Sequence, residues 1–165
     1  MIFVTVGTHE QAFDRLIREI DTLKERNIIT EEVYCQIGYC EYIPKFCSWK
    51  RLIPYNEMIE NVKKARITIS HGGPASFLLP LQFGKIPIVV PRKVDFNEHV
   101  NNHQLEFSKT VSERMKNIIM IENIEVLGDT IVKYDDLVSN MDASDVKNNR
   151  NFCKKFDKIV SWIAE

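Results

Sequence analysis

Short apolar segments alternate with longer amphipathic segments along most of the sequence. The first apolar segment, residues 2–6, is rich in β-branched residues and ends at Gly7, which is typical of a buried strand that stops at a tight turn. In residues 11–26 the apolar side chains instead recur every three or four positions, and this spacing predicts an amphipathic helix. Near-continuous apolar strands separated by helices predict a parallel sheet covered on both faces, that is, a doubly wound Rossmann-like α/β domain.

The same patterns predict strands over 2–6, 32–37, 50–53, 66–70, 87–90 and 118–121. Helices are predicted over 11–26, 55–65, 75–83, 97–115, 124–134 and 144–163. The chain has 165 residues, which is about the size of one domain, and we find no internal repeat or low-complexity linker in it. We therefore expect a single domain over 1–165.

Charge and cysteine content exclude several classes of protein. The 22 Lys and Arg residues nearly balance the 23 Asp and Glu residues, so the net charge of -1 gives no field that would hold a nucleic acid backbone. The N-terminus carries no basic leader, and its apolar run is far shorter than a bilayer span, so we expect a cytoplasmic protein. The four cysteines show neither Cys-x-x-Cys nor zinc-finger spacing, and we expect them to be reduced thiols.

Polar residues follow several of the predicted strands. They are Gly7, Thr8, His9 and Glu10 after the first strand, Gly38 after the second, His71 to Ser76 after the fourth and Arg92 to His99 after the fifth. Ligands of open parallel sheets lie outside the carboxyl ends of the strands. We therefore expect these residues to share one edge of the sheet and one site.

The strongest local signal is residues 71–76, His-Gly-Gly-Pro-Ala-Ser. Two glycines, a proline suited to a first helical turn and a hydroxyl at the helix start predict a phosphate seat at a helix N-terminus. The alternative is a tight turn whose glycines only supply positive φ. The segment is not a dinucleotide fingerprint, which would follow the first strand, and no Gly-Lys-Ser/Thr of a P-loop occurs.

Residues 95–104 gather carboxylates, amides and imidazoles at a predicted helix start, and such groups suit sugar hydroxyls. The alternative is a solvated helix start with Asp95 or Asn97 as its cap. His99 and His103 are four residues apart, but there is no His-Glu-x-x-His order and no evident third ligand. We therefore expect no metal site.

Four stretches, taken in order, resemble the C-terminal, donor-binding half of GT-B glycosyltransferases of family 28. They are residues 4–8 with 13–14, residues 36–38, residues 70–73 with 76, and residues 87–91 with 97–104. Within this group the sequence resembles stand-alone halves, namely the catalytic subunit of the eukaryotic split N-acetylglucosaminyltransferase and bacterial capsular or exopolysaccharide β-1,4-galactosyltransferase subunits. Residues 4–11 and 96–104 favour the bacterial set.

The resemblance implies the catalytic subunit of a two-component, inverting hexosyltransferase that takes a hexose, with galactose favoured, from a UDP-sugar. The acceptor would be a lipid-linked saccharide in polysaccharide synthesis, and a membrane-associated partner subunit would supply the other GT-B half. The chain would then lie at the inner face of the membrane through its partner. The family's transfer chemistry uses no metal ion, so no cofactor is expected.

The resemblance also assigns roles to residues. The nucleotide and its diphosphate would be bound by Gly7, Thr8, Gly38, Gly72, Gly73, Ser76 and Arg92, and the donor sugar by Glu98, His99 and Asn102. Relatives often carry an acidic residue that binds the ribose five positions before the glycine that ends this helix, and Leu79 stands there in this sequence. Another group must therefore bind the ribose.

The catalytic residues expected are His9 as general base, Glu10 as the second candidate for that role, and His71 beside the leaving diphosphate. The base could equally belong to the partner, and His9 could be only a hydrogen-bonded loop residue. Two functional alternatives remain from the sequence. One is a non-catalytic subunit that binds UDP-sugar and activates a partner transferase, and the other is an α/β hydrolase or epimerase that acts on nucleotide sugars alone.

Overall fold

The computed structural model describes residues 1–141 and contains a six-stranded sheet in the order β3-β2-β1-β4-β5-β6. Every strand pairs parallel to its neighbours. The strands are β1 Ile2–Thr5, β2 Val33–Gln36, β3 Ser48–Lys50, β4 Ile67–His71, β5 Ile88–Val90 and β6 Ile119–Met120. The strand order changes direction between β1 and β4, which is where doubly wound folds bind ligands. The predicted fold class is confirmed.

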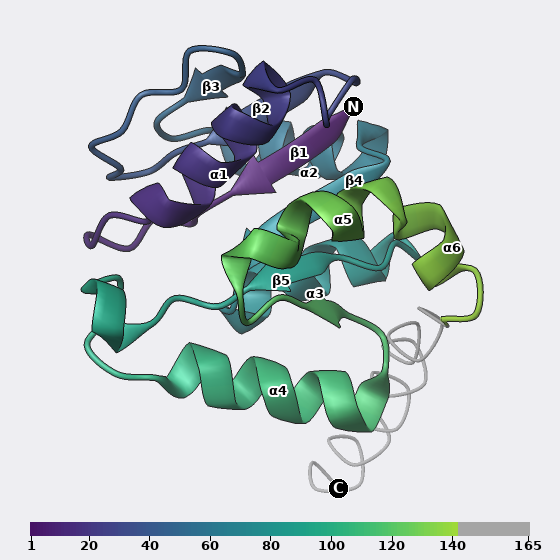
Figure 1. Ribbon diagram of the computed structural model, residues 1–165. Coiled ribbons are helices and arrows are strands. Elements are labelled where there is room, and N and C mark those ends of the chain that lie inside the picture. Colours follow the sequence, from purple (N-terminus) through teal and green to yellow (C-terminus); the bar gives the residue numbers. More distant parts are fainter. Residues whose placement is uncertain (142–165) are drawn as a thin grey trace, which may run out of the picture.

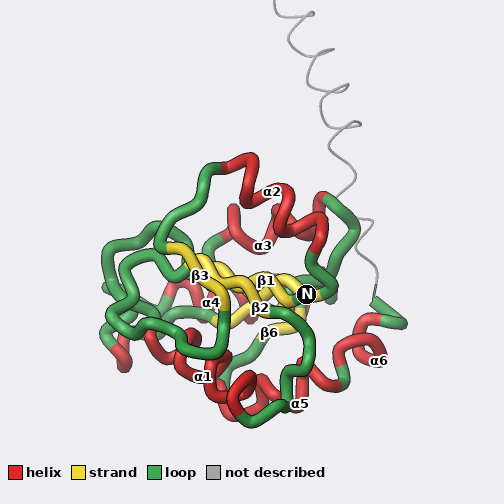
Figure 2. Tube along the Cα trace, turned by 90° about the horizontal axis from the view of Figure 1, so that it is seen from above, coloured by secondary structure: helices red, strands yellow, loops and turns green. Residues whose placement is uncertain are grey.

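Helices cover both faces of the sheet. They are α1 Asp14–Glu25, α2 Tyr55–Lys64, α3 Pro74–Gln82, α4 His103–Met115, α5 Leu127–Val132 and α6 Tyr134–Val138. Figure 2 shows α2 and α3 above the sheet and α1 and α5 below it. The long helix α4 runs beside the β6 end of the sheet (Figure 1), where Phe107 packs against Phe77 of α3 with ring centroids 6.0 Å apart.

Strand β1 explains why the apolar runs are nearly continuous. Its side chains alternate between the two faces: Ile2 and Val4 pack in the core on the α1 side, and Phe3 packs with residues of α2 and α3. All three are fully buried. Each such side chain stabilises the fold by roughly 1.5–3 kcal/mol when it leaves water, so a strand of this kind has no solvent face. Helix α1 buries its predicted apolar stripe in the same core.

Two predicted boundaries are wrong. Strand β3 lies at Ser48–Lys50 and not at 50–53, because pairing with β2 fixes its register, and its exposed edge carries no apolar pattern. Helix α4 begins at His103 and not at 97, because Asn97 takes the left-handed conformation with φ 56° and ends the 3-10 turn η1, Val94–Phe96. Neither Asp95 nor Asn97 therefore caps α4, whose cap residue is Asn102.

The predicted helix over 124–134 is divided into the 3-10 turn η2, Ile124–Val126, followed by α5 and the start of α6. Tyr134 begins α6, and its hydroxyl donates to the carbonyl of Ile86 at 2.6 Å. The predicted helix over 144–163 lies outside the described residues. A single domain over 1–165 also includes those residues, so it stays a prediction.

Cys35, Cys40 and Cys47 are buried free thiols, as expected, while Cys153 lies outside the described residues. Burial raises the pKa of the Cys40 thiol to about 11, so this group stays protonated at neutral pH. Over residues 1–141, the chain forms no helix with the length and hydrophobicity that a membrane span requires.

Candidate functional site

A cleft of about 1160 Å³ lies at the carboxyl ends of β1 and β4. One wall is the loop after β1, from Gly7 to Gln11, and another is the first turn of α3, from Gly73 to Ser76. An apolar wall comes from the β3–α2 connection, α2 and α3, and includes Leu52, Ile53 and Leu79. The cleft therefore occupies the edge of the sheet that the sequence predicts, and its size suits a small-molecule ligand.

The ring of His71, at the end of β4, lies between the backbones of two glycines. A Cβ added at Gly7 would lie 2.4 Å from its Nε2 atom, and a Cβ added at Gly73 would lie 2.3 Å from its Cε1 atom. Gly7 also has φ +76°, but Gly73 has an ordinary φ of -74°. The glycine in the turn is therefore needed for space beside the imidazole, so the alternative that it only supplies positive φ is wrong.

Hydrogen bonds assign the protonation state of His71. The Gly73 N–H donates to Nδ1 at 3.0 Å, so the proton of the neutral ring is on Nε2, which lies 2.8 Å from the Ser76 hydroxyl oxygen. Burial, and after it the positive charge of Arg92, lower the pKa of His71 to about 4. At neutral pH the ring thus donates to Ser76, and the hydroxyl hydrogen of Ser76 is left for an acceptor in the cleft.

Helix α3 begins at the same place. Gly73 is its cap residue and Pro74 its first residue, so the proline lies in the first helical turn as the sequence predicts, one residue before the predicted helix start. The Ser76 side chain makes no cap hydrogen bond and bonds His71 instead. The first turn of a helix carries backbone N–H groups without helical partners and the positive end of the helix dipole. This turn lines the cleft, so an anion in the cleft would meet both the helix end and the Ser76 hydroxyl.

Gln36, which sequence reasoning did not assign to the site, holds the Gly7 peptide at both ends. Its Oε1 accepts from the Gly7 N–H at 3.2 Å, and its Nε2 donates to the Gly7 carbonyl at 2.9 Å. The same amide accepts from the Thr5 hydroxyl and donates to the Arg51 carbonyl. A glutamine ending a buried strand was the available signal, since a buried amide must find partners for every polar atom.

We expect Gln36→Glu to lower the free energy of unfolding at pH 7 by roughly 2–3 kcal/mol. The carboxylate is nearly isosteric but removes both donated hydrogen bonds and faces the Gly7 and Arg51 carbonyls. Urea unfolding measures the change, with Gln82→Glu on the exposed end of α3 as the control. Equal stability of the two variants would contradict this role.

His9 and Glu10 are exposed and line the cleft with Thr8. The Nδ1 atom of His9 accepts the Gln11 N–H at 3.2 Å. Its ring lies against that of His99, with centroids 4.8 Å apart. Partial burial, the charge of His9 and that of Arg92 lower the pKa of His99, in that order. The structure thus brings together the predicted base and one predicted sugar-binding histidine, from loops ninety residues apart in the chain.

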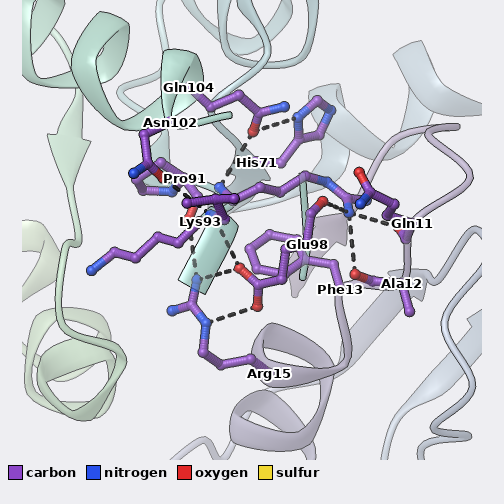
Figure 3. Close-up of polar contacts among 12 residues, drawn as sticks. Gln11, Ala12, Phe13, Arg15, His71, Pro91, Lys93, Glu98, Asn102 and Gln104 are labelled. Atoms are coloured by element: carbon purple, nitrogen blue, oxygen red, sulfur yellow. Dashed lines mark hydrogen bonds and ion pairs between the residues drawn. The ribbon is translucent and has the colours of Figure 1, made fainter. Parts of the chain in front are cut away.

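Arg92, which was predicted to bind the nucleotide or its diphosphate, is buried outside the lining of the cleft. It is only 1% exposed, does not line the cleft, and its guanidinium bonds carbonyls of the surrounding loops. A guanidinium engaged in this way is not placed to meet a diphosphate in the cleft. Glu98 is likewise 3% exposed, and Arg15 and the Lys93 N–H bind its carboxylate (Figure 3). Neither side chain is presented to a donor sugar.

Three other predicted residues lie behind the cleft walls. A Cβ at Gly38 would lie 2.7 Å from the Gly7 carbonyl, and one at Gly72 would lie 2.7 Å from the Ser108 hydroxyl of α4. These two glycines therefore allow close packing beneath the site. Asn102 accepts the Val94 N–H at 3.0 Å and closes the loop before α4. Its contact with a donor sugar, and that of His99, stay predictions.

The sequence profile of the glycosyltransferase family 28 C-terminal domain matches residues 1–160. The chain belongs to this family. The resemblance in the sequence is thereby confirmed, and membership of the family 28 C-terminal domain speaks against the hydrolase or epimerase alternative.

One relative is the human UDP-N-acetylglucosamine transferase subunit ALG13, which is 35% identical over 118 residues. The match covers 66% of this chain but 10% of that protein, so this chain corresponds to a small part of it. Among solved structures, the glycotransferase of kitacinnamycin matches with a TM-score of 0.59 at 15% identity, over 84% of this chain and 35% of that one. The structural match supports the fold of the family 28 domain.

Proposed function

We propose that this family 28 domain is the donor-binding catalytic subunit of a two-component, inverting UDP-sugar hexosyltransferase. The observation that carries the proposal is the start of α3 in the cleft, where the helix end and the hydroxyl of Ser76, oriented by His71, meet at one point. The human relative is named as a subunit of a UDP-N-acetylglucosamine transferase, which supports both a UDP-sugar and a partner.

In the proposed complex the diphosphate binds at the first turn of α3. No lysine or arginine lines the part of the cleft formed by residues 1–141, so the helix end and the Ser76 hydroxyl supply the positive potential on this side. Neutral His71 donates to Ser76 and leaves its hydroxyl hydrogen to a phosphate oxygen. These groups stabilise the charge of the leaving UDP without a metal ion.

The nucleoside would lie along the apolar wall of Leu52, Ile53, Met58 and Leu79. A flat base buries well against such side chains. Leu79 occupies the position of the acidic residue that relatives use for the ribose, and Glu10 is the one carboxylate that residues 1–141 contribute to the cleft lining. We therefore propose that the partner subunit supplies the group that binds the ribose hydroxyls.

For the proton of the acceptor hydroxyl we propose His9 as base and Glu10 as the second candidate. An imidazole suits proton transfer near neutral pH. Because Nδ1 of His9 accepts the Gln11 N–H, the ring must exchange its tautomer before Nε2 can act as a base. Glu10 needs no such change, and it lies on the same exposed loop.

The partner would be membrane-associated, would bring a lipid-linked saccharide acceptor to the cleft, and would hold this subunit at the inner face of the membrane. The resemblance to bacterial polysaccharide subunits favours galactose as the hexose, whereas the name of the human relative makes N-acetylglucosamine the competing donor. Calorimetry with UDP-galactose, UDP-N-acetylglucosamine and UDP-glucose distinguishes these donors.

Ser76→Ala is expected to weaken UDP binding by about tenfold, because it removes one hydrogen bond to a charged phosphate. Isothermal titration calorimetry of the isolated chain measures the dissociation constant. Ser112→Ala on α4, away from the cleft lining, is the control and should bind UDP like the wild type. Unchanged affinity for UDP in Ser76→Ala, or no binding of UDP by the wild type, would contradict the proposed function.

A second function, a non-catalytic subunit that binds UDP-sugar and activates its partner, is favoured by one observation. The candidate bases lie on an exposed loop, and the tautomer of His9 is not the one that a base needs. Transfer by the reconstituted pair separates the two functions. Full activity in His71→Ala and Ser76→Ala would support the non-catalytic subunit, and loss of turnover would support catalysis by this cleft.

A further inference from the structure

Beneath the cleft, the guanidinium of Arg92 joins two loops that are far apart in the sequence. From the loop after β1 it binds the carbonyls of Val6 at 2.9 Å, Gln11 at 2.7 Å and Ala12 at 3.3 Å. From the loop after β5 it binds the carbonyl of Glu98 at 3.0 Å. Four backbone acceptors on one buried cation fix the separation of the two loops.

A second connection joins α1, which directly follows the first of these loops, to the loop after β5. Arg15, in the first turns of α1, donates to both carboxylate oxygens of Glu98 at 2.9 and 2.8 Å and to the carbonyl of Pro91 at 3.1 Å. The carboxylate also accepts the Lys93 N–H at 3.0 Å. This bidentate pair is nearly buried, with side-chain exposures of 14% and 4%, so its geometry is well defined.

The connection reaches the phosphate seat as well. The backbone N–H of Arg92 donates to Oε1 of Gln104 at 3.3 Å. That oxygen also lies 3.4 Å from Nδ1 of His71, which is a packing contact and not a hydrogen bond, because Nδ1 of the neutral ring already accepts the Gly73 N–H. Gln104 itself lines the cleft. The side chain of Gln104, which accepts the backbone N–H of Arg92, therefore also packs against the histidine that orients Ser76.

Removing these charged groups from water costs free energy, so stability alone does not explain why they are buried. Arg92 and Arg15 face one carboxylate, Glu98, and burial lowers the pKa of Arg92. Apolar residues of similar size often stabilise a core as well as buried ions do. The cluster instead lies directly under the groups that would act on the substrate, since the two loops carry His9 and His99, whose rings are in contact.

We propose that Arg92 is a positioning residue for the transfer reaction, and that Arg15 and Glu98 form its second connection. Together they hold the loop of the candidate base against the loop of the candidate donor-sugar residues. The catalytic part of this inference rests on the proposed function, whereas the position of the loops can be measured in the isolated chain.

The first test compares Arg15→Gln with Arg18→Gln. Both residues are on α1, but the Arg18 side chain is 59% exposed. Its one ion pair over residues 1–141 is a surface pair with Asp14, in which the guanidinium nitrogen lies 3.8 Å from the carboxylate oxygen. In the reconstituted pair, Arg15→Gln should lower kcat by about 10²-fold with KM for the donor little changed, because misplacing a catalytic group by about 1 Å costs that much. Arg18→Gln should leave both constants as in the wild type.

The second test records the imidazole resonances of His9 and His99 by NMR in the isolated chain. Arg15→Gln and Arg92→Lys should both move these signals, because the two adjacent rings separate and lose their mutual ring-current shift, whereas Arg18→Gln should not. Glu98→Gln gives a third, nearly isosteric variant if Arg92→Lys does not fold. Calorimetry with UDP should show donor binding retained in Arg15→Gln, since the start of α3 is unaffected.

Unmoved histidine signals in Arg15→Gln and Arg92→Lys, or wild-type kcat in Arg15→Gln, would overturn the positioning role. An equal loss in Arg15→Gln and Arg18→Gln would overturn it too, because a general effect on α1 would then explain both. If the wild-type pair transfers no sugar, the proposed function fails, and the NMR comparison still decides whether Arg92 and Arg15 position the loops.

Discussion

Gly7→Ala is expected to weaken UDP binding by at least about tenfold, as much as loss of the Ser76 hydroxyl, whereas Gly84→Ala should bind UDP like the wild type. The two glycines have nearly the same backbone conformation, with φ +76° and +72°. Alanine in this conformation costs roughly 1–2 kcal/mol at either position. Only at Gly7 does the new Cβ meet a side chain, 2.4 Å from Nε2 of His71, while nothing lies within 4 Å at Gly84.

The added methyl group must push the His71 ring away from Ser76, and with it the hydroxyl that we assign to the diphosphate. Overpacking adds roughly 1–3 kcal/mol to the backbone cost, so the free energy of unfolding should fall by about 2–5 kcal/mol in Gly7→Ala and about 1–2 kcal/mol in Gly84→Ala. Calorimetry and urea unfolding measure both quantities. Tight UDP binding by a folded Gly7→Ala variant would show that the His71 position does not matter for the ligand.

Acidification from pH 7 to pH 5 should destabilise the wild-type chain by about 2 kcal/mol more than the His71→Asn variant. The pKa of His71 is lowered to about 4, first by burial and then by the charge of Arg92. Because the unfolded histidine takes up its proton near pH 6.5, the unfolded state binds more protons between about pH 6.5 and 4. The stability that the neutral ring contributes is therefore complete above pH 6.5 and is lost as the pH falls through this window.

Asparagine at position 71 keeps an oxygen for the Gly73 N–H but does not titrate. His99, whose pKa is also lowered, is present in both proteins and cancels in the difference. The carboxylates of Asp21 and Glu31 have lowered pKa values, so their contributions are lost below about pH 4.5, outside the range compared. Urea unfolding at intervals of pH gives the two curves, and parallel curves would show that His71 is not held neutral.

The predicted strand and helix types hold for the described residues, but their limits do not follow from local sequence where tertiary contacts set them. Asn97 illustrates this, because its left-handed conformation ends η1 and delays α4 by six residues relative to the predicted start. Strand β3 shows the same for a sheet edge, where pairing with β2 selects Ser48–Lys50 although apolar residues follow. Those apolar residues, Leu52 and Ile53, line the cleft instead.

The candidate site was predicted best where the residue type itself indicates the local backbone structure, such as a turn or a helix start. Gly7, Gly73 and Ser76 lie on the cleft as expected, because a strand end and a helix start are local features. Arg92 and Glu98 were assigned to ligands by the resemblance to family 28, which matches positions along the sequence and does not report which way a side chain points. Both are buried instead, and each binds partners contributed by the loop after β1 or by α1. Gln36 was missed because its role depends on the position of the Gly7 peptide.

The sequence by itself determined the parallel α/β fold, the edge of the sheet that carries the cleft, and the helix start that suits a phosphate. Hydrophobic periodicity and turn residues are local properties, so they can be recognised in short segments of the sequence. Only the tertiary structure decided which polar side chains face the cleft and which hold the loops beneath it. That choice depends on contacts between residues about eighty positions apart, such as Arg15 with Glu98 and Arg92 with Gln11, which no local pattern encodes.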